Sequence, residues 1–373
     1  MLKRMRGMKL GLFSMPLHRP EKPFPQTLEE DREAILLADR LGYAEAWIGE
    51  HFTSKVEQIT SPLIFLATLI RETRTIRFGT GVINLPHHHP VTIASHAALF
   101  DQLAEGRFLF GIGPGGLISD AEMYGHNDVA ERQRMMLAAI DIIVALWRGE
   151  PPYRFETEWW DIALDESVYP RHGIGLVAKP WQDPHPPIAM AMVSAHSSSA
   201  SLCGTRGWIP ISANFIPSRD VATHWPLYAA AAEKAGRPVD PSVWRVARNL
   251  LVTESESRAR DILADPDGLF HFYFRYLRSL RRLPEVKAVA DAPVEELNAL
   301  LDVEEAVADI PICGTARTVL DRLVALREEI GAFGTLLIGM HDWEDQDLCR
   351  TSMQRLAEEV LPALSQHCKA LGD

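Results

Sequence analysis

The ten residues RFLFGIGPGG, Arg107–Gly116, decide between two folds. Gly111, Gly113 and Gly116 fit the spacing G-x-G-x-x-G and follow an apolar run that is typical of a strand. In a doubly wound sheet such a loop follows the first strand, leads directly into a helix and binds the pyrophosphate of a dinucleotide. Taken alone, the stretch would therefore predict a nicotinamide dehydrogenase.

The surroundings of the stretch favour a different fold. Its strand is the fourth in the chain, and the segment that follows, Leu117–Asp128, has no helical apolar period. The acidic residue expected about twenty positions further on would be Glu131, which lies inside a predicted helix. Because a lone G-x-G-x-x-G is weak evidence, we predict instead a glycine-lined loop at the mouth of a barrel strand. There the backbone can approach a flat ligand closely.

Apolar runs alternate with amphipathic segments along the whole chain. The predicted strands are Lys9–Phe13, Ala44–Gly49, Thr75–Val82, Arg107–Gly113, Ile188–Val193, Gly207–Ser212, Trp244–Val252 and Gly334–Gly339. The first predicted helix, Thr27–Leu41, has Thr27 as N-cap and Glu30 three residues on, a capping box. Ser61 is the expected N-cap of the second. Eight β-α units favour an α/β protein with a closed (β/α)8 TIM barrel over an open sheet, which usually has five or six strands.

The chain is longer than a bare barrel requires. Its 373 residues exceed the roughly 250 that are typical of this fold. The surplus lies in two insertions, residues 150–187 and 264–309. The first is rich in Trp, Tyr and Pro and predicts a hairpin with a long loop; the second begins with an aromatic helix and becomes acidic. Neither is typical of a separate domain, so we predict a single domain over residues 1–373.

Composition excludes several classes of function. The net charge is −12 with no basic block, which argues against a nucleic-acid partner. The longest apolar runs, of about ten residues, are too short to span a bilayer. The basic start, Met1–Leu10, is followed by no apolar stretch or cleavage site, so no signal peptide is expected. The four cysteines form no C-x-x-C pair, which fits a reducing cytoplasm and argues against a zinc or redox motif.

Several segments together resemble one family, the bacterial luciferase-like flavin-dependent monooxygenases. These segments are Leu41–Phe52, Ile76–Pro90, Phe100–Gly116, Tyr124–Met135 and Gly334–Asp345. Their order and spacing carry the resemblance, which covers most of the chain. Within the family, the chain resembles limonene monooxygenase and the diketocamphane monooxygenases. The shared features are the GPGG-x-x-SDAEMYG loop, the Trp159-Trp160-Asp161 turn, His224-Trp225 and the tail Glu358–Pro362.

The resemblance implies an FMN-dependent oxygenase. Reduced FMN (FMNH2) would come from a separate NAD(P)H:flavin reductase, and in the family oxygen adds at the flavin C4a carbon. The resulting peroxide inserts one oxygen atom into an organic substrate, here a hydrophobic cyclic ketone or terpene. The resemblance also implies a homodimer formed through the helices near the second and third strands. An F420-dependent oxidoreductase that transfers hydride, or a non-catalytic flavin-binding protein, remains an alternative.

His51 is the candidate catalytic residue. It ends the second strand in W-x-x-E-H, and the mouth of a barrel strand is where catalytic groups lie. Histidine can transfer a proton near neutral pH, and by resemblance His51 protonates or retains the distal oxygen. The alternative is a histidine that serves packing only. Glu50 is expected to brace the barrel interior. Phe52 replaces a second histidine of many relatives and favours an apolar substrate pocket.

The resemblance also assigns residues to the flavin. Gly81 and Val82 are expected to form a non-prolyl cis peptide beneath the isoalloxazine ring, and Asn84 to bond its edge or serve as an ordinary loop residue. Gly113 stands where the luciferases carry a thiol near C4a, and it leaves open space there. Pro114 replaces an arginine that binds phosphate in the luciferases, so that contact is missing.

The phosphate of FMN is expected near the fifth strand. The residues assigned to it are Arg132, Ser197, Ser198 and Ser199, with Val193 and Ser194 lining the flavin. A helix start with free N–H groups and hydroxyls is an anion site, although the serines also make sense as plain N-caps. The alternative for Arg132 is a surface charge paired with Asp128 or Glu131.

Three consecutive histidines, His87, His88 and His89, do not predict a metal site. Consecutive side chains cannot all face one ion, and no carboxylate cluster accompanies them in the sequence. We predict a loop in which one of the three contacts the substrate, and we expect no bound metal.

Overall fold

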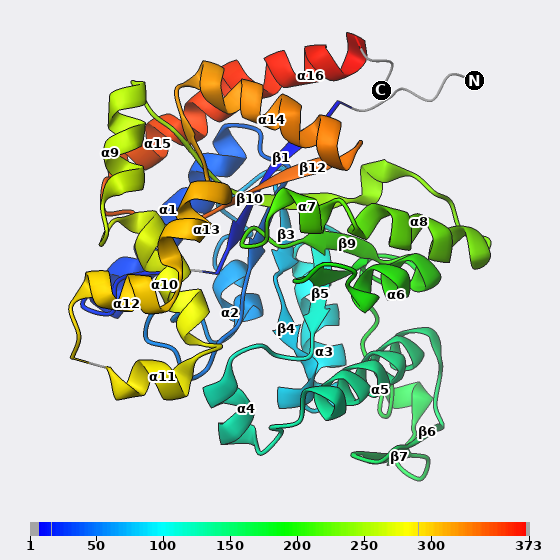
Figure 1. Ribbon diagram of the computed structural model, residues 1–373. Coiled ribbons are helices and arrows are strands. Elements are labelled where there is room, and N and C mark those ends of the chain that lie inside the picture. The colour runs from blue at the N-terminus through cyan, green and yellow to red at the C-terminus, as the bar shows by residue number, and fades with distance from the viewer. Residues whose placement is uncertain (1–6, 16, 290, 371–373) are drawn as a thin grey trace.

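The computed structural model describes residues 7–15, 17–289 and 291–370, and in this part of the chain eight parallel strands close into a barrel surrounded by helices (Figure 1). The barrel strands are β1 (Lys9–Ser14), β2 (Glu45–Ile48), β3 (Arg77–Thr80), β5 (Phe108–Gly113), β8 (Ile188–Met192), β9 (Ile209–Ser212), β10 (Arg245–Val252) and β12 (Thr335–Gly339). The ring runs β10-β12-β1-β2-β3-β5-β8-β9 and returns to β10. The predicted barrel is confirmed, and an open doubly wound sheet is excluded.

Helices and short strands complete the fold. They are α1 (Phe24–Arg40), α2 (Pro62–Ala67), β4 (Ile83–Asn84), α3 (Pro90–Leu103), α4 (Ile118–Tyr124), α5 (Val129–Arg148), β6 (Tyr153–Glu156), β7 (Asp161–Leu164), α6 (Ser198–Arg206), α7 (Ser218–Val221), α8 (His224–Lys234), α9 (Glu256–Ala264), α10 (Leu269–Ser279), α11 (Leu283–Ala288), α12 (Val294–Leu300), α13 (Val303–Asp309), β11 (Ile312–Gly314), α14 (Ala316–Ile330), α15 (Gln346–Arg355) and α16 (Leu361–Ala370). Residues 1–6, the basic start for which no signal peptide is expected, lie outside the described residues.

The inside of the barrel is packed with apolar side chains. Trp47 is fully buried there among residues of five other strands, Leu109, Ala189, Ile209, Ile211, Ala247 and Leu337. Gly79 on the neighbouring strand is required, because a Cβ there would lie 2.3 Å from the Trp47 ring. At the amino ends of the strands, Arg245 forms a buried ion pair with Glu45 at 2.6 Å. The filled interior leaves the carboxyl ends of the strands as the place for a site.

Two local predictions on helices are wrong. The predicted capping box fails because α1 begins at Phe24, before Thr27, and the Thr27 hydroxyl donates to the Phe24 carbonyl at 2.9 Å. Pro25 explains the earlier start, since proline in a first turn loses no helical hydrogen bond. The segment after Gly116 does form a short helix, α4. Only Asp120 and Ala121 of α4 are buried, so no apolar period marks it.

The two predicted insertions contain a hairpin and a group of helices. The first contains the expected antiparallel hairpin, β6–β7. The second folds into the helices α10–α13, and the aromatic residues of α10 pack in a separate apolar cluster with α13. Figure 1 shows α10–α13 beside the barrel, toward the end at which β1 points. Across the described part of the chain, no helix has both the length and the apolar character needed to cross a membrane.

Candidate active site

His51 lies just beyond the end of β2, between two buried carboxylates. Its Nε2 atom is 3.3 Å from Oε2 of Glu57, and its Nδ1 atom is 3.5 Å from Oδ2 of Asp120. The side chain is only 8% exposed. Burial by itself would lower the pKa of His51, but the carboxylates of Glu57 and Asp120 outweigh it and raise the pKa above its usual value. The imidazole can therefore hold a proton at the mouth of the barrel.

Asp120, on α4, is held in place from several directions. Its carboxylate accepts hydrogen bonds from the backbone N–H groups of Phe52 (3.1 Å) and Thr53 (2.9 Å) and from the Thr53 hydroxyl (2.6 Å). Burial would raise the pKa of Asp120, but these donors and His51 keep it below its usual value. Asp120 therefore stays ionised and fixes the orientation of the imidazole.

Glu57 connects His51 to the second insertion. Its Oε2 atom accepts a hydrogen bond from the hydroxyl of Tyr276, on α10, at 2.7 Å. That hydroxyl also lies 2.9 Å from Oγ of Ser54. Glu57 and Tyr276 are not predicted from the sequence. Neither lies in a motif, and 219 residues separate them. Asp120 lies in the SDAEMYG segment, and the sequence predicts no role for it.

Glu50 fastens the end of β2 to the connection that leads to α3. Its carboxylate accepts from the Asn84 backbone N–H at 3.0 Å and lies 2.9 Å from Nε2 of His88. The Asn84 side-chain amide donates in turn to the Glu50 carbonyl at 2.9 Å. The carboxylate of Glu50 is thus engaged with its neighbours and holds Asn84 at the mouth.

Four of the residues assigned to the flavin ring come together beside His51. The Gly81–Val82 peptide bond is cis, as the resemblance implies. It lies between β3 and β4, and β4 pairs with β5 so that Asn84 is opposite Gly113. A Cβ atom at Gly113 would lie 2.5 Å from Cγ2 of Val82. The expected open space at Gly113 is therefore wrong, because the Val82 side chain packs there. Contact of these residues with a flavin stays a prediction.

Aromatic rings form a wall next to this group. The rings of His87 and Tyr124 stack with centroids 4.6 Å apart, and Phe52 meets Tyr124 at 5.3 Å and His88 at 5.8 Å. Burial lowers the pKa of His87 to about 4, so its ring is neutral near pH 7. Neither ring nitrogen of His87 has a hydrogen-bond partner among the described residues. The third histidine, His89, instead caps α3, so the three side chains diverge.

Arg132 is buried rather than a surface charge. It is 6% exposed, and its guanidinium donates to the His126 carbonyl at 2.6 Å. The alternative of a surface pair with Asp128 or Glu131 is therefore wrong, because the side chain points inward from the first turns of α5. Its Nε atom has no hydrogen-bond partner within the described residues. A buried donor without a partner is costly, which fits an anionic ligand.

The serines assigned to the phosphate lie at the start of α6. Ser197 is the N-cap and is buried, yet no side chain caps this helix. Ser198 is exposed and Ser199 half-buried, while Val193 and Ser194 are exposed in the loop before them. The first N–H groups of a helix have no partner within it, so this helix start fits a phosphate group. Binding of phosphate there stays a prediction.

A second cluster of ionisable groups lies apart from His51. His18 has Nδ1 3.4 Å from Glu30 and 3.3 Å from Asp342, and its Nε2 is 3.2 Å from Asp31. This cluster is not predicted from the sequence. His18, Glu30 and Asp342 are close enough together to ligate a cation. However, the Lys22 ammonium contacts both Glu30, at 2.8 Å, and Asp342, so it already supplies a positive charge.

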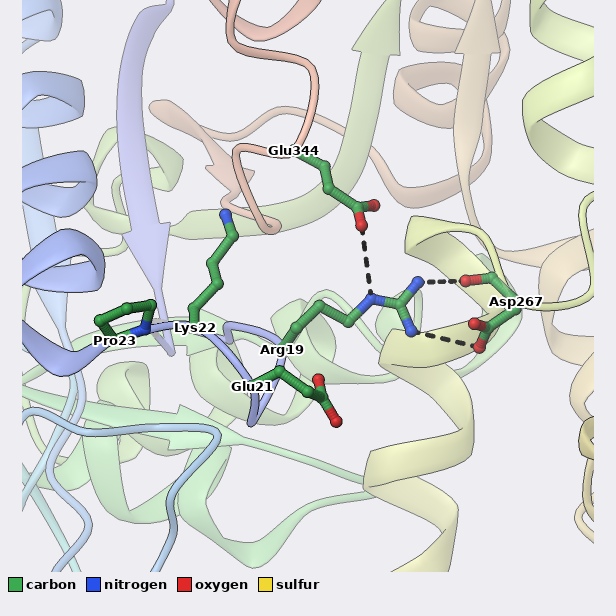
Figure 2. A pocket seen from close by; sticks show the side chains of 6 residues that line it. All are labelled: Arg19, Glu21, Lys22, Pro23, Asp267 and Glu344. Atoms are coloured by element: carbon green, nitrogen blue, oxygen red, sulfur yellow. Dashed lines mark hydrogen bonds and ion pairs between the residues drawn. The ribbon is translucent and has the colours of Figure 1, made fainter.

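A charged pocket opens beside this cluster. It has a volume of about 540 Å³ and is lined by Arg19, Glu21, Lys22, Pro23, Asp267 and Glu344 (Figure 2). Figure 2 shows Arg19 reaching across it to Asp267, at 3.1 Å, and to Glu344. A lining of charged groups is poorly suited to a flat apolar ring, and it includes none of the residues assigned to the flavin.

Comparison with known proteins identifies the family of the chain. The family model described as luciferase-like monooxygenase matches residues 8–332. The 4-hydroxyprotoasukamycin monooxygenase of Streptomyces nodosus subsp. asukaensis is 31% identical over 96% of this chain and 92% of its own length. Limonene 1,2-monooxygenase of Rhodococcus erythropolis is 29% identical over 94% of this chain and 85% of its own length.

A solved structure matches at the level of the fold and the sequence. It is the oxygenating constituent of 3,6-diketocamphane monooxygenase from Pseudomonas putida, a type II Baeyer-Villiger monooxygenase in complex with FMN. The TM-score is 0.81 at 26% identity, over 96% of this chain and 98% of that one. The chain belongs to the luciferase-like monooxygenases.

Proposed function

We propose that this protein is the oxygenase component of a two-component system. It would use reduced FMN from a separate NAD(P)H:flavin reductase to insert one atom of O2 into a hydrophobic cyclic ketone or terpene. The observation that carries this proposal is the place of His51. It lies between Glu57 and Asp120 at the same barrel mouth as the Gly81–Val82 bond.

The residues at the mouth fit FMN. Gly81, Val82, Asn84 and Gly113 would hold the ring, with Val193 and Ser194 lining it. The serines Ser197, Ser198 and Ser199, together with Arg132, would hold the phosphate. Two structural observations support the fit, namely the helix start without a side-chain cap and the buried Arg132 Nε without a partner. When bound, reduced flavin supplies two electrons, so that one oxygen atom of O2 enters the substrate and the other leaves as water.

The side chains around the ring have separate tasks. His51 holds a proton that it can pass to a developing oxygen anion, because the carboxylates of Glu57 and Asp120 stabilise its charged form. Phe52, His87 and Tyr124 present an aromatic wall that excludes water and suits an apolar substrate. The second insertion contributes Tyr276 from α10 and so lies close to the reacting groups.

FMN is the favoured cofactor over F420. F420-dependent members of the fold often carry aspartate before the histidine, whereas this chain has Glu50. Anaerobic titration with reduced FMN and with reduced F420 tests this directly, followed by mixing with ¹⁸O2 and a panel of cyclic ketones and terpenes. We expect tighter binding of reduced FMN and one ¹⁸O atom in a product. Tight binding of reduced F420 with no ¹⁸O in any product would favour the hydride-transfer enzyme. FMN binding without any product would favour a flavin-binding protein.

We also propose a homodimer through α2 and α3. These helices pack side by side, and each presents exposed apolar side chains, Ile64 (74% exposed) on α2 and Leu99 (57%) on α3. Light scattering is expected to give the mass of two chains for the wild-type protein. The same measurement on the I64E/L99E variant is expected to give the mass of one chain. The matched control is I118E, which places the same charge on an exposed apolar position of α4. A wild-type monomer at micromolar concentration would contradict the proposal.

The proposed compartment is the cytoplasm. Cys203, Cys313 and Cys349 are free thiols. Free thiols in this number fit a reducing compartment.

A further inference from the structure

We infer that His224 and Thr223, which have no role in the proposed reaction, are positioning residues for the cofactor phosphate. They fix the backbone of Ser194–His196, and thereby the start of α6. The inference rests on the proposed function, because it concerns the phosphate of FMN. Its basis is a set of buried and partly buried hydrogen bonds that join β9, Trp244 just before β10, and α8 to this loop.

His224 is the central member of the set. It is fully buried at the first position of α8. Its Nε2 atom lies 2.8 Å from the carbonyl oxygen of Ser194, and its Nδ1 atom lies 2.9 Å from Oγ of Ser212, on β9. The indole N–H of Trp244 donates to the same Ser212 oxygen at 2.9 Å. The Ser194 carbonyl is thus connected to the barrel wall through two side chains.

The chemistry of these groups fixes the direction of each hydrogen bond. A carbonyl can only accept, so Nε2 of His224 carries the proton. Burial lowers the pKa of His224, so the ring is neutral and Nδ1 is an acceptor. The Ser212 hydroxyl then donates to Nδ1, while its oxygen accepts from Trp244, which can only donate. Every donor in the set has an acceptor, so His224 is held in one tautomer and one orientation.

Thr223 holds the other end of the same loop. Its Oγ1 atom accepts from the backbone N–H of His196 at 2.9 Å and donates to the Asp220 carbonyl at 2.7 Å. His196 has φ of 51°, in the left-handed region that few residues other than glycine adopt. An acceptor placed on its N–H stabilises this conformation. Two adjacent residues therefore hold the loop at Ser194 and at His196.

The loop leads directly to the proposed phosphate site. Ser197 follows His196 and is the N-cap of α6. Helices α6 and α8 pack closely against each other, as Figure 1 also shows. Because the first N–H groups of α6 have no partner within the helix, their direction depends on where this backbone is held. Thr223 and His224 set that direction relative to the barrel, where the flavin ring would lie.

A pair of His224 variants separates the two hydrogen bonds of the ring. H224N places an acceptor near Nδ1 but has no group that reaches Ser194. H224Q places a donor near Nε2. Anaerobic dissociation constants for reduced FMN and reduced riboflavin measure the part of the affinity that depends on phosphate. We expect H224N to lower the preference for FMN about tenfold, as for the loss of one buried hydrogen bond. H224Q should retain the preference for FMN within about twofold. The affinity for reduced riboflavin should change little in both H224N and H224Q.

A variant of Thr223 and a variant of the proposed phosphate site itself complete the test. T223V keeps the shape of the side chain and removes the acceptor for His196, so it should also lower the preference for FMN; it carries the test if H224N does not fold. S198D places a negative charge at the exposed start of α6 and should lower FMN affinity without affecting riboflavin. If H224N and T223V keep the wild-type preference for reduced FMN over reduced riboflavin while S198D loses it, the inference is overturned and the proposed phosphate site remains. An equal loss of FMN and riboflavin would show a structural role only and also overturn it. No effect in S198D would contradict the proposed phosphate site itself.

Discussion

Replacing His51 with alanine is expected to lower product formation at least 100-fold and to leave binding of reduced FMN within about threefold of the wild type. General acid catalysis typically contributes about 10²- to 10⁴-fold to a rate. Burial alone would lower the pKa of His51, but Glu57 and Asp120 at the mouth raise it and so favour its protonated form. Its removal therefore takes away the proton while the ring and phosphate contacts of the cofactor remain.

The experiment measures product per turnover of reduced FMN, with reductase in excess, alongside the dissociation constant of reduced FMN. The matched control is H172A, which removes an exposed histidine of the first insertion and should leave both values unchanged. D120N is expected to lower the pKa of His51 and to shift the pH profile of product formation toward acid. Unchanged product formation in H51A would remove His51 from the mechanism.

The second large effect concerns stability and comes from the cluster around His18. Burial would lower the pKa of His18, but Asp31 and Asp342 raise it to about 9. A histidine whose folded-state pKa lies above its unfolded value of 6.5 adds stability that is fully present below pH 6.5. That stability is lost as the pH rises toward 9. We expect the free energy of unfolding to fall by about 3 kcal/mol over this range.

Urea titrations at several pH values between 6 and 10 measure this loss. The His18→Gln variant should be less stable than the wild type at pH 6.5, and its stability should fall much less between pH 6.5 and 9, because the contribution of His18 to the pH dependence is gone. H172Q serves as the control and should follow the wild-type curve. An equal pH dependence in wild type and H18Q would show that His18 does not hold the proton.

The strands of the barrel were predictable, and the reason is their burial on both sides. Each barrel strand is a short apolar run bounded by loops, and all eight appear among the described residues close to their expected positions. Helices with few buried residues were not predictable. The clearest case is α4, whose buried side chains include the charged Asp120. The helices α11–α13 lie in an acidic stretch and were likewise not distinguished from one another.

The candidate site was predictable where it depends on strand ends. His51, the Gly81–Val82 bond and Gly113 each follow or end a barrel strand, and parallel strands bring these ends together. Residues that approach the site from loops and insertions carry no such signal. Tyr276 donates a hydrogen bond to Glu57, which is 219 residues away in the sequence. His18, which follows β1, contacts Asp342, which follows the paired strand β12. Only the folded chain shows these partners.

A crystal structure of the protein with FMN tests the central claim most directly. The account predicts the phosphate at the start of α6, bonded to the serines Ser197–Ser199. It also predicts the ring against Gly81–Val82 and Gly113, with its reacting edge toward His51. A phosphate bound elsewhere, for example in the charged pocket at Arg19 and Lys22, or a ring that lies away from His51, would contradict it.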